Sequence, residues 1–238
     1  PVVTTEHELI VDSGGPGSSR GGMGVEKGVT LTKAERSVVS YCCDRERSVT
    51  WGLWGGLPSI PHGVWVNPGT QGERYLGSLF SGVPVESGDV LTRPSAGGGG
   101  LGDPLERTTE DVCVDVREGY VSIERAAKDY GVVVREVDAD LAEYEVDEAA
   151  TTEMRQFISE NRHAWLDEDG ESVAARYRSK ELDKFDLVRQ YGVIVDWGSG
   201  ELLPKTTQQF RDMLKRRTAA HWAIPGQVRN EEPTLRVA

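Results

Sequence analysis

Short apolar runs separated by polar turns fill the first hundred residues of the chain. Five of these runs are rich in β-branched residues, and they cover residues 2–5, 8–11, 28–32, 37–41 and 63–66. Runs of this length, bounded by Gly, Pro, Asp and Ser, are typical of strands joined by tight turns. Residues 83–91 predict one more turn that leads into a strand. The pattern therefore predicts a β region over residues 1–104.

After Pro104 the apolar residues recur at helical spacing. Residues 108–111 read Thr-Thr-Glu-Asp, a capping box in which a hydroxyl and a carboxylate satisfy free amide groups of a first helical turn. Ser122 and Gly131 predict the start and the end of a helix over residues 123–130. The apolar residues 132–134 that follow predict a buried strand.

A second capping box, residues 206–209, predicts the last helix. Phe210, Met213 and Leu214 fall at helical intervals after it, and basic residues follow in the last turns, where the helix dipole favours them. We therefore predict an α+β fold, in which a glycine-rich β region (1–104) precedes a mainly helical, mixed region (105–224). The tail, residues 225–238, has no periodic pattern and is expected to be loosely held.

One segment inside the helical region is strongly acidic. Residues 138–171 carry twelve acidic and two basic residues. We interpret this segment as a connector or as the solvated face of a helix, which is how charge runs usually behave. A docking surface for a basic partner is the alternative.

The composition narrows the class of protein. The formal net charge is −12, whereas a nucleic-acid binder needs a positive face, and no apolar run is long enough to span a bilayer. Three cysteines cannot form a disulfide framework, which fits a reducing cytoplasm. We expect a cytoplasmic chain without nucleic-acid or membrane partners. Because it begins at Pro1, we expect a processed product or a piece of a longer polypeptide.

Glycine is concentrated in the β region, which holds 21 of the 28 glycines by residue 102. The densest run is Gly97, Gly98, Gly99 and Gly100, followed by Asp103 and Pro104. It lacks the Lys-Ser/Thr pair that completes a phosphate-binding P-loop. Asp103 and Pro104 predict the first turn of a helix, so an anion could lie at its N-terminus. Close packing of backbone on backbone explains the same glycines without a ligand, and we favour it.

Two other glycine clusters contain arginine. In residues 12–24, Arg20 could clamp a carboxylate or phosphate with its planar donors, or it could pair with a structural acid such as Asp12. In residues 45–58, Arg45 precedes two tryptophans that are interleaved with glycines. Such tryptophans could line a pocket for an apolar ring, but core or interface anchors are the commoner role.

Familiar catalytic sets do not appear in the sequence. The four histidines lie in unrelated contexts, and there is no Gly-x-Ser-x-Gly nucleophile elbow. Cys42 and Cys43 end an apolar run and are expected to be buried packing residues. The residues by themselves predict a scaffold, with catalytic residues unknown.

Four motifs in register resemble one known family. They are the glycine and arginine cluster at 12–24, the Trp-Gly-Leu-Trp-Gly-Gly-Leu-Pro run at 51–58, the glycine tetrad with Asp-Pro at 97–104, and residues 112–132. Together they resemble the C-terminal region of the hydantoinase B/oxoprolinase family. The segment 185–204 is similar to the longer ending of carboxylase-type B subunits.

The resemblance implies a function. Members are B-type subunits that work in hetero-oligomers with an ATP-binding A-type subunit, where phosphorylation of an enol or amide oxygen activates the substrate. We expect the chain to be the C-terminal region of such a subunit, with a leaning to carboxylation of ketones such as acetone or acetophenone. ATP-dependent hydrolysis of cyclic amides such as hydantoins or 5-oxoproline is the alternative. A non-catalytic docking module of the complex is the alternative of another class.

The family's metal-binding residues are implied elsewhere. They lie in the N-terminal part of the subunit, in an Asn-Asp-Pro…Gly-Gly-x-His region that nothing in residues 1–238 matches. A divalent metal is therefore expected outside this chain, and the chain alone is expected to be inactive. Contact with a substrate or an anion is expected from Arg20 first, then from Arg45, the glycines 97–100 and Asp103.

Overall fold

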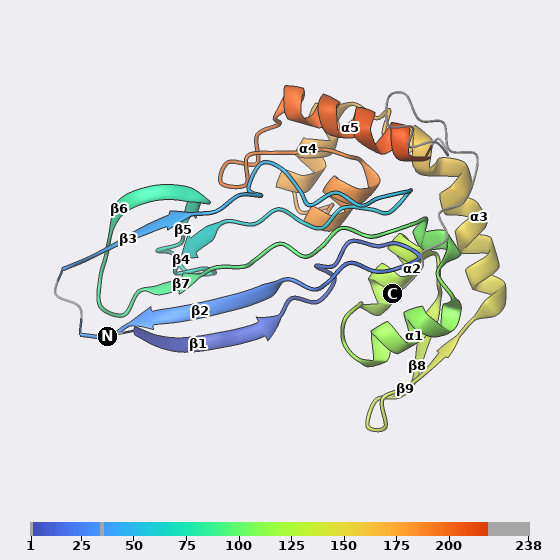
Figure 1. Cartoon of the computed structure of the whole chain (residues 1–238), viewed down its shortest axis with the longest axis horizontal. Helices are drawn as coiled ribbons and strands as arrows, with labels where there is room; N and C mark the ends of the chain where they lie inside the picture. Colours follow the sequence, from blue (N-terminus) through green and yellow to red (C-terminus); the bar gives the residue numbers. More distant parts are fainter. Residues whose placement is uncertain (1, 34–35, 219–238) are drawn as a thin grey trace, which may run out of the picture.

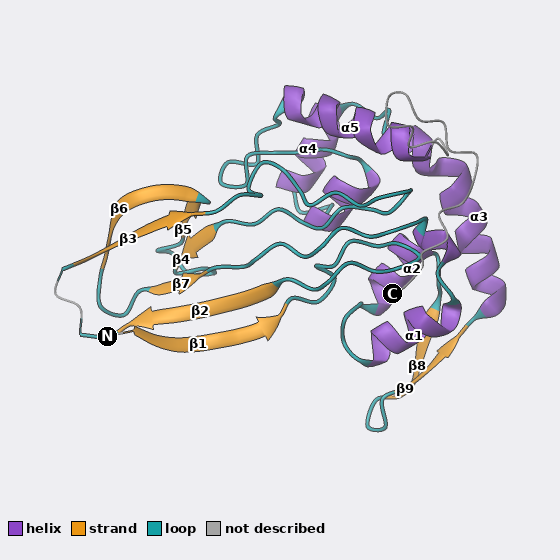
Figure 2. Ribbon diagram, in the orientation of Figure 1, coloured by secondary structure: helices purple, strands orange, loops and turns teal. Residues whose placement is uncertain are grey.

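The computed structural model describes residues 2–33 and 36–218. The strands of the first hundred residues gather at one end of the molecule and the helices at the other, with long loops running between them (Figures 1 and 2). The main antiparallel sheet has the strand order β1 (Val2–Leu9), β2 (Val25–Leu31), β7 (Val90–Thr92), β4 (Val64–Val66), β5 (Arg74–Gly77). A separate two-stranded sheet pairs β3 (Ser37–Cys42) with β6 (Leu79–Val85).

The two sheets share a small apolar core. Val64, Val66, Val85 and Leu91 are buried in it, and half-buried residues of β2 and β3 pack around them. The edge strand β1 is different, because among the described residues it pairs with β2 alone and none of its eight side chains is buried. The sheet therefore has one well-packed part and one open edge.

The helical end follows the predicted order. Its elements are η1 (Pro104–Glu106), α1 (Thr109–Arg117), α2 (Ile123–Tyr130), β8 (Val134–Asp138), β9 (Glu143–Val146), α3 (Glu148–Trp165), α4 (Gly170–Arg178), the π-helical turn η2 (Asp186–Gln190) and α5 (Pro204–Thr218). The α+β fold predicted from the sequence is confirmed. No helix within residues 2–33 and 36–218 is long and apolar enough to cross a membrane.

The local capping signals are confirmed. Thr108 Oγ1 accepts a hydrogen bond from the Asp111 amide (3.1 Å), and Ser122 Oγ accepts one from the Arg125 amide (3.1 Å). Gly131 ends α2 at φ 65°, in the left-handed region that glycine adopts most easily. These caps fix where α1 and α2 begin and where α2 meets the following strand.

Some boundaries differ from the predictions. Helix α5 begins at Pro204, so Thr206 does not cap it; proline suits the first helical turn, and Thr207 Oγ1 instead accepts a hydrogen bond from the buried Ile194 amide (3.0 Å). The predicted strand over 132–134 begins at Val134, because the Val132 amide bonds to the last turn of α2. The runs at 2–5 and 8–11 do not form two strands, because residues 2–9 form the single strand β1, which ends before residues 10 and 11.

Strands β5, β6 and β9, helix α4 and the π-helical turn η2 were not predicted. Neither β5 nor α4 carries a capping box or a long apolar run. Cys42 is exposed and Cys43 half-buried, so the prediction that both are buried is wrong. The predicted loose tail (225–238) lies outside the described residues.

The acidic segment 138–171 contains β9 and the whole of the long helix α3. Helix α3 buries only Thr151 and Ile158. The two basic residues of the segment point inward: Arg155 donates to the Arg107 carbonyl (2.6 Å) and Arg162 to the Asp103 carboxylate (2.7 Å). These two arginines attach the otherwise solvated helix to the loop at residues 103–107.

Candidate functional site

Three glycine-rich loops meet between the sheet and the helices. We call residues 12–24, 51–58 and 97–103 the glycine junction. Main-chain hydrogen bonds cross it from Gly15 to Gly98 (2.8 Å), from Gly100 to Leu57 (3.0 Å) and from Leu57 to Pro16 (2.7 Å). The backbone of each loop is therefore the surface against which the others pack.

Close approach of the backbone excludes a side chain at most glycines of the junction, although not at Gly22. A Cβ atom on Gly99 would overlap the carbonyl of Trp51, and one on Gly100 would overlap that of Pro16. A Cβ atom on Gly97 would overlap the carbonyl of Ser13. Packing of backbone on backbone thus accounts for Gly97, Gly99 and Gly100, while a Cβ atom on Gly98 would lie 3.1 Å from the Gly22 amide nitrogen. Contact of Gly97 to Gly100 with a substrate stays a prediction.

Arg20 is held by an acid on helix α1. Its Nε and Nη2 atoms donate to Asp115 at 3.0 and 3.2 Å, and Arg107 donates to the same carboxylate at 2.9 Å. The Arg20 side chain is only 16% exposed. The structural acid is therefore Asp115 and not Asp12, whose carboxylate accepts a hydrogen bond from the Ser122 amide (2.7 Å).

The other predicted contacts also have structural partners. Arg45 adopts φ 77° and lies over the ring of Trp51, 5.4 Å from its centroid. Trp51 and Trp54 are about half exposed, so the core role suggested for them is wrong, while an interface role stays a prediction. Asp103 caps the short η1 through the Leu105 amide (3.0 Å) and places a carboxylate where an anion was expected.

A buried arginine ties the helices to the junction. Arg189, on η2, has a side chain that is 2% exposed. Its Nη1 pairs with Asp129 of α2 (2.6 Å), and its other nitrogens donate to the carbonyls of Pro58 (3.1 Å), Asp12 (2.7 Å) and Gly14 (3.1 Å). One side chain therefore connects η2, α2 and two of the three glycine loops.

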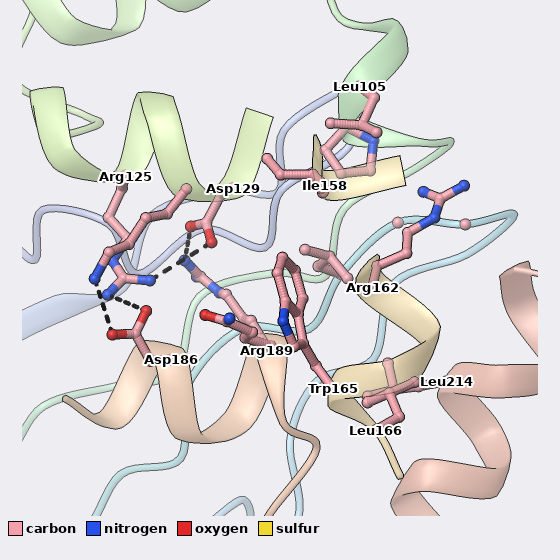
Figure 3. A pocket seen from close by; sticks show the side chains of 16 residues that line it. Leu105, Arg125, Asp129, Ile158, Arg162, Trp165, Leu166, Asp186, Arg189 and Leu214 are labelled. Carbon is pink, nitrogen blue, oxygen red and sulfur yellow. Dashed lines mark hydrogen bonds and ion pairs between the residues drawn. The ribbon is translucent and has the colours of Figure 1, made fainter. Parts of the chain in front are cut away.

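Arg189 belongs to a larger group of charges. Arg125 lies 3.6 Å from Asp129, 2.8 Å from Asp186 and 2.5 Å from Asp183. Burial works to lower the pKa of Arg125, but the charges of Asp129, Asp186 and Asp183 together raise it above its ordinary value. We call Arg125, Asp129, Asp186 and Arg189 the ionic cluster; Figure 3 shows its members joined by dashed lines.

A cavity of about 70 Å³ lies beside the ionic cluster. The ionic cluster forms one wall, and the bare backbone of Gly55 and Gly56 forms part of another. Apolar side chains complete it: Leu57, Leu105, Ile158, Trp165, Leu166 and Leu214. Figure 3 shows Trp165 and Ile158 between the ionic cluster and the side of α3 that carries Arg162.

Neither the ionic cluster nor the cavity was predicted from the sequence. Arg125 and Asp129 have the i, i+4 spacing of a helical ion pair, which was the one available signal. Asp186 and Arg189 lie some sixty positions after Arg125 and Asp129, on a π-helical turn that no local sequence pattern predicts. Such turns are rare and occur often at functional sites.

The described residues offer no ready metal site. Within residues 2–33 and 36–218, no group of three or more His, Cys, Asp and Glu side chains is placed to hold a metal ion. The carboxylates of the ionic cluster are already paired with arginine and lysine. These side chains therefore do not fit a divalent metal.

Comparison with known families and proteins agrees with the motifs. Residues 1–104 match the hydantoinase B/oxoprolinase family. Among relatives, the caprolactamase subunit beta of Pseudomonas jessenii is 31% identical over 156 residues, covering 63% of this chain and 25% of that protein. The acetone carboxylase alpha subunit of Xanthobacter autotrophicus is 29% identical over 215 residues, covering 74% of this chain and 27% of that protein.

Two solved structures are similar. A nucleotide-free acetone carboxylase superposes with a TM-score of 0.58 at 25% identity, covering 90% of this chain and 32% of that one. The ATP-dependent caprolactamase from Pseudomonas jessenii gives 0.53 at 30% identity, covering 66% and 26%. The match places residues 1–104 in the hydantoinase B/oxoprolinase family, as the sequence motifs predicted. The chain spans about a quarter of the length of the curated relatives it matches.

Proposed function

We propose that this chain is the C-terminal region of a hydantoinase B-type subunit in an ATP-dependent multisubunit enzyme, and that the enzyme carboxylates a ketone. The observation that carries the choice of reaction is the extent of the likeness. Similarity to the acetone carboxylase structure covers 90% of the chain, whereas similarity to the caprolactamase structure covers 66%. The helical end therefore favours the carboxylase.

Within that enzyme, the chain supplies a rigid platform. Backbone hydrogen bonds and the buried Arg189 lock the glycine junction to α2 and η2. In this proposal the ATP-binding A-type partner, the metal and the reacting groups lie outside this chain. The isolated chain is therefore inactive. A cytoplasmic location belongs to the same proposal.

ATP-dependent opening of a cyclic amide is the second candidate. It is supported by the caprolactamase, which is the more similar in sequence of the two structural neighbours, at 30% identity against 25%. A lactam and a ketone both need activation at a carbonyl oxygen, so the platform serves either reaction equally well. Turnover has to decide between them.

The deciding experiment uses the full-length subunit together with its partner subunit. The complex is incubated with ATP and labelled bicarbonate, in parallel with acetone, acetophenone, caprolactam, hydantoin and 5-oxoproline. Label in a carboxylated ketone is the expected result. Ring-opened product that forms without bicarbonate would replace the first proposal by the second. ATP hydrolysis that no substrate of either kind stimulates would overturn both.

A further inference from the structure

One loop of the glycine junction exposes three large apolar side chains. Trp51, Leu53 and Trp54 are 47%, 42% and 48% exposed. We call residues 51–54 the tryptophan loop. Exposed apolar side chains that stand singly are ordinary, whereas a cluster of them marks an interaction surface. Nothing in the proposed function assigns a use to this cluster.

The fold itself holds these side chains toward solvent. Gly52 is buried, and a Cβ atom there would overlap the carbonyls of Gly56 and Gly100, so this position faces the glycine junction. Leu53 forms a parallel bridge with Leu101, which keeps the chain extended. Because successive side chains of an extended chain point to opposite sides, the residues on either side of Gly52 face outward.

Trp54 is also strained. Its φ is 49°, in the left-handed region that residues with a side chain rarely adopt. Glycine would remove this strain, and the half-exposed indole gains little from burial in return. The fold of this chain by itself therefore does not explain a tryptophan at this position. Strained residues of this kind occur mainly at functional sites, where another contact makes use of them.

The tryptophan loop is ordered before any partner binds. The Leu53 carbonyl accepts hydrogen bonds from the amides of Gly56 (3.0 Å) and Gly102 (2.9 Å). Arg45 lies over the ring of Trp51 and restrains it. A surface that is already rigid loses little conformational entropy on binding. Tryptophan is also among the residues most enriched where the energy of an interface is concentrated.

The length of the relatives indicates what covers the loop. This chain spans 25% of the caprolactamase subunit beta and 27% of the acetone carboxylase alpha subunit, so most of either subunit lies outside the matched region. A body joined to the same polypeptide reaches the loop at a far higher effective concentration than a separate protein does. A second copy of the chain is disfavoured, because two chains of net charge −12 repel each other.

We propose that the tryptophan loop is where the rest of the same subunit docks, with an apolar pocket that buries both indole rings. The proposal rests on the proposed function in one respect, which is that the chain is a region of a longer hydantoinase B-type subunit. It does not depend on the reaction that the enzyme carries out. The A-type partner and a second copy of this chain are the alternative occupants, and the test separates the three.

The test compares the solvent exposure of the tryptophans in three samples: the chain of residues 1–238, the full-length subunit alone, and the full-length subunit with its A-type partner. Hydroxyl-radical labelling followed by mass spectrometry measures this exposure. Trp51 and Trp54 should react about fivefold more slowly in the full-length subunit alone than in the 1–238 chain, since side chains at the centre of an interface are fully desolvated. Adding the A-type partner should change the rates no further.

The other outcomes of the labelling contradict the proposal. Rates that stay high in all three samples would mean that nothing covers the loop. Protection that appears only with the A-type partner would assign the loop to that subunit. Protection that rises with the concentration of the 1–238 chain alone would assign it to a second copy.

Trp54→Gly separates docking from folding. In the chain of residues 1–238 it should unfold at the same urea concentration or a higher one, because glycine adopts the left-handed region without strain. In the full-length subunit it should return Trp51 to within about twofold of its reactivity in the 1–238 chain, because the interface loses an anchor. Lys180→Gly is the matched control, since Lys180 is exposed and also left-handed, at φ 63°, but polar. The control should leave Trp51 protected.

Leu53→Ser is the second variant, and it removes an apolar side chain without relieving any strain. It should also expose Trp51 in the full-length subunit, and a Trp51 that stays protected in both folded variants would overturn the proposal. The radical labelling and the labelled-bicarbonate assay are independent. A complex that opens lactams but protects the loop would refute the ketone carboxylase and keep the docking site, and a ketone carboxylase with an exposed loop would do the reverse.

Discussion

The glycine junction and the helical end are both well packed, but main-chain atoms make the contacts in the first and side chains make them in the second. In the junction, main-chain atoms of three loops touch one another, and a glycine stands on at least one side of the closest approaches. At the helical end, fully buried side chains such as Val173, Leu187 and Val193 fill the interior. Most glycines of the junction leave no room for an added carbon atom, whereas the helical end loses stability when a carbon atom is removed.

Arg189 is where these two kinds of packing meet. Its aliphatic stem leaves η2 among the helices, and its guanidinium group ends among the carbonyl oxygens of the glycine loops. A glycine has no side chain to contribute hydrophobic contacts, so a partner that holds these glycine-rich segments has to reach their main chain. The junction therefore depends on the helical end for the hydrogen bonds that Arg189 donates to its carbonyls.

The largest expected effect comes from breaking this link. Arg189→Met keeps an apolar stem but leaves Asp129 with a weaker partner in Arg125 and three carbonyls unsatisfied. Breaking a buried ion pair in this way costs about 3–5 kcal/mol, so we expect a loss near 4 kcal/mol in urea unfolding. Arg178→Met, at a more exposed pair with Glu171, should change stability by less than about 0.5 kcal/mol. Similar losses of unfolding free energy in both variants would show that the contacts of Arg189 stabilise the protein no more than those of an exposed ion pair.

A cavity at the helical end comes next. Leu187 is fully buried, so Leu187→Ala should lower the free energy of unfolding by about 3 kcal/mol, within the usual range for such truncations. The same denaturation curves measure it. Leu141→Ala, at a leucine that is 68% exposed, is the control and should be close to neutral. A small loss at Leu187 would mean that this core collapses around the gap.

The reverse change tests the junction. Gly99→Ala adds one methyl group against the Trp51 carbonyl, and overpacking of this kind costs about 2 kcal/mol. Gly22→Ala is the matched control in the same junction, because a Cβ atom there meets nothing within 4 Å and its φ is not positive. The control should be neutral or stabilise slightly, since alanine restricts the unfolded chain. If both substitutions behave alike, backbone contact is not what selects glycine here.

The smallest effect concerns pH. Burial, followed by the charge of Arg93, lowers the pKa of His62 below its ordinary value of 6.5. The folded state therefore binds fewer protons than the unfolded state just below pH 6.5, so the stability from neutral His62 is present above that pH and is lost as the pH falls.

His62→Gln should flatten the dependence of unfolding free energy on pH in this range, as measured by urea titrations at a series of pH values. His7→Gln is the control, since His7 lies exposed on β1. A pH dependence that survives in the His62 variant would assign it to another group.

Local chemistry made part of this fold predictable. A hydroxyl at Thr108 or Ser122 and a glycine at Gly131 act within four residues of their own position, so their effects could be derived from sequence. The capping box at residues 206–209 gave a wrong helix start, because a local signal does not show which of its groups are used in other contacts. A proline two residues earlier offered a competing start, and the neighbouring Thr207 was drawn into a distant contact with Ile194.

Distant contacts set the limit of prediction at the site. The pairing of Arg20 with an acid was a correct alternative, but Asp115 lies 95 positions away and no spacing rule connects the two. Arg189 donates to main-chain carbonyls about 130 to 180 positions away. Every residue has a main-chain carbonyl, so the sequence does not identify which one accepts. The glycine motifs were recognisable because each missing side chain records a close approach, although the sequence does not say to what.

The edge position of β1 has a consequence for hydrogen exchange. Eight residues are joined to the rest of the sheet along one side only, and no side chain among them is buried. Detaching this strand exposes little apolar surface, so it should occur by local opening at a small fraction of the cost of global unfolding. Amide protons of β1 should therefore exchange with deuterium much earlier than those of β4 and β7, although all three belong to the same sheet.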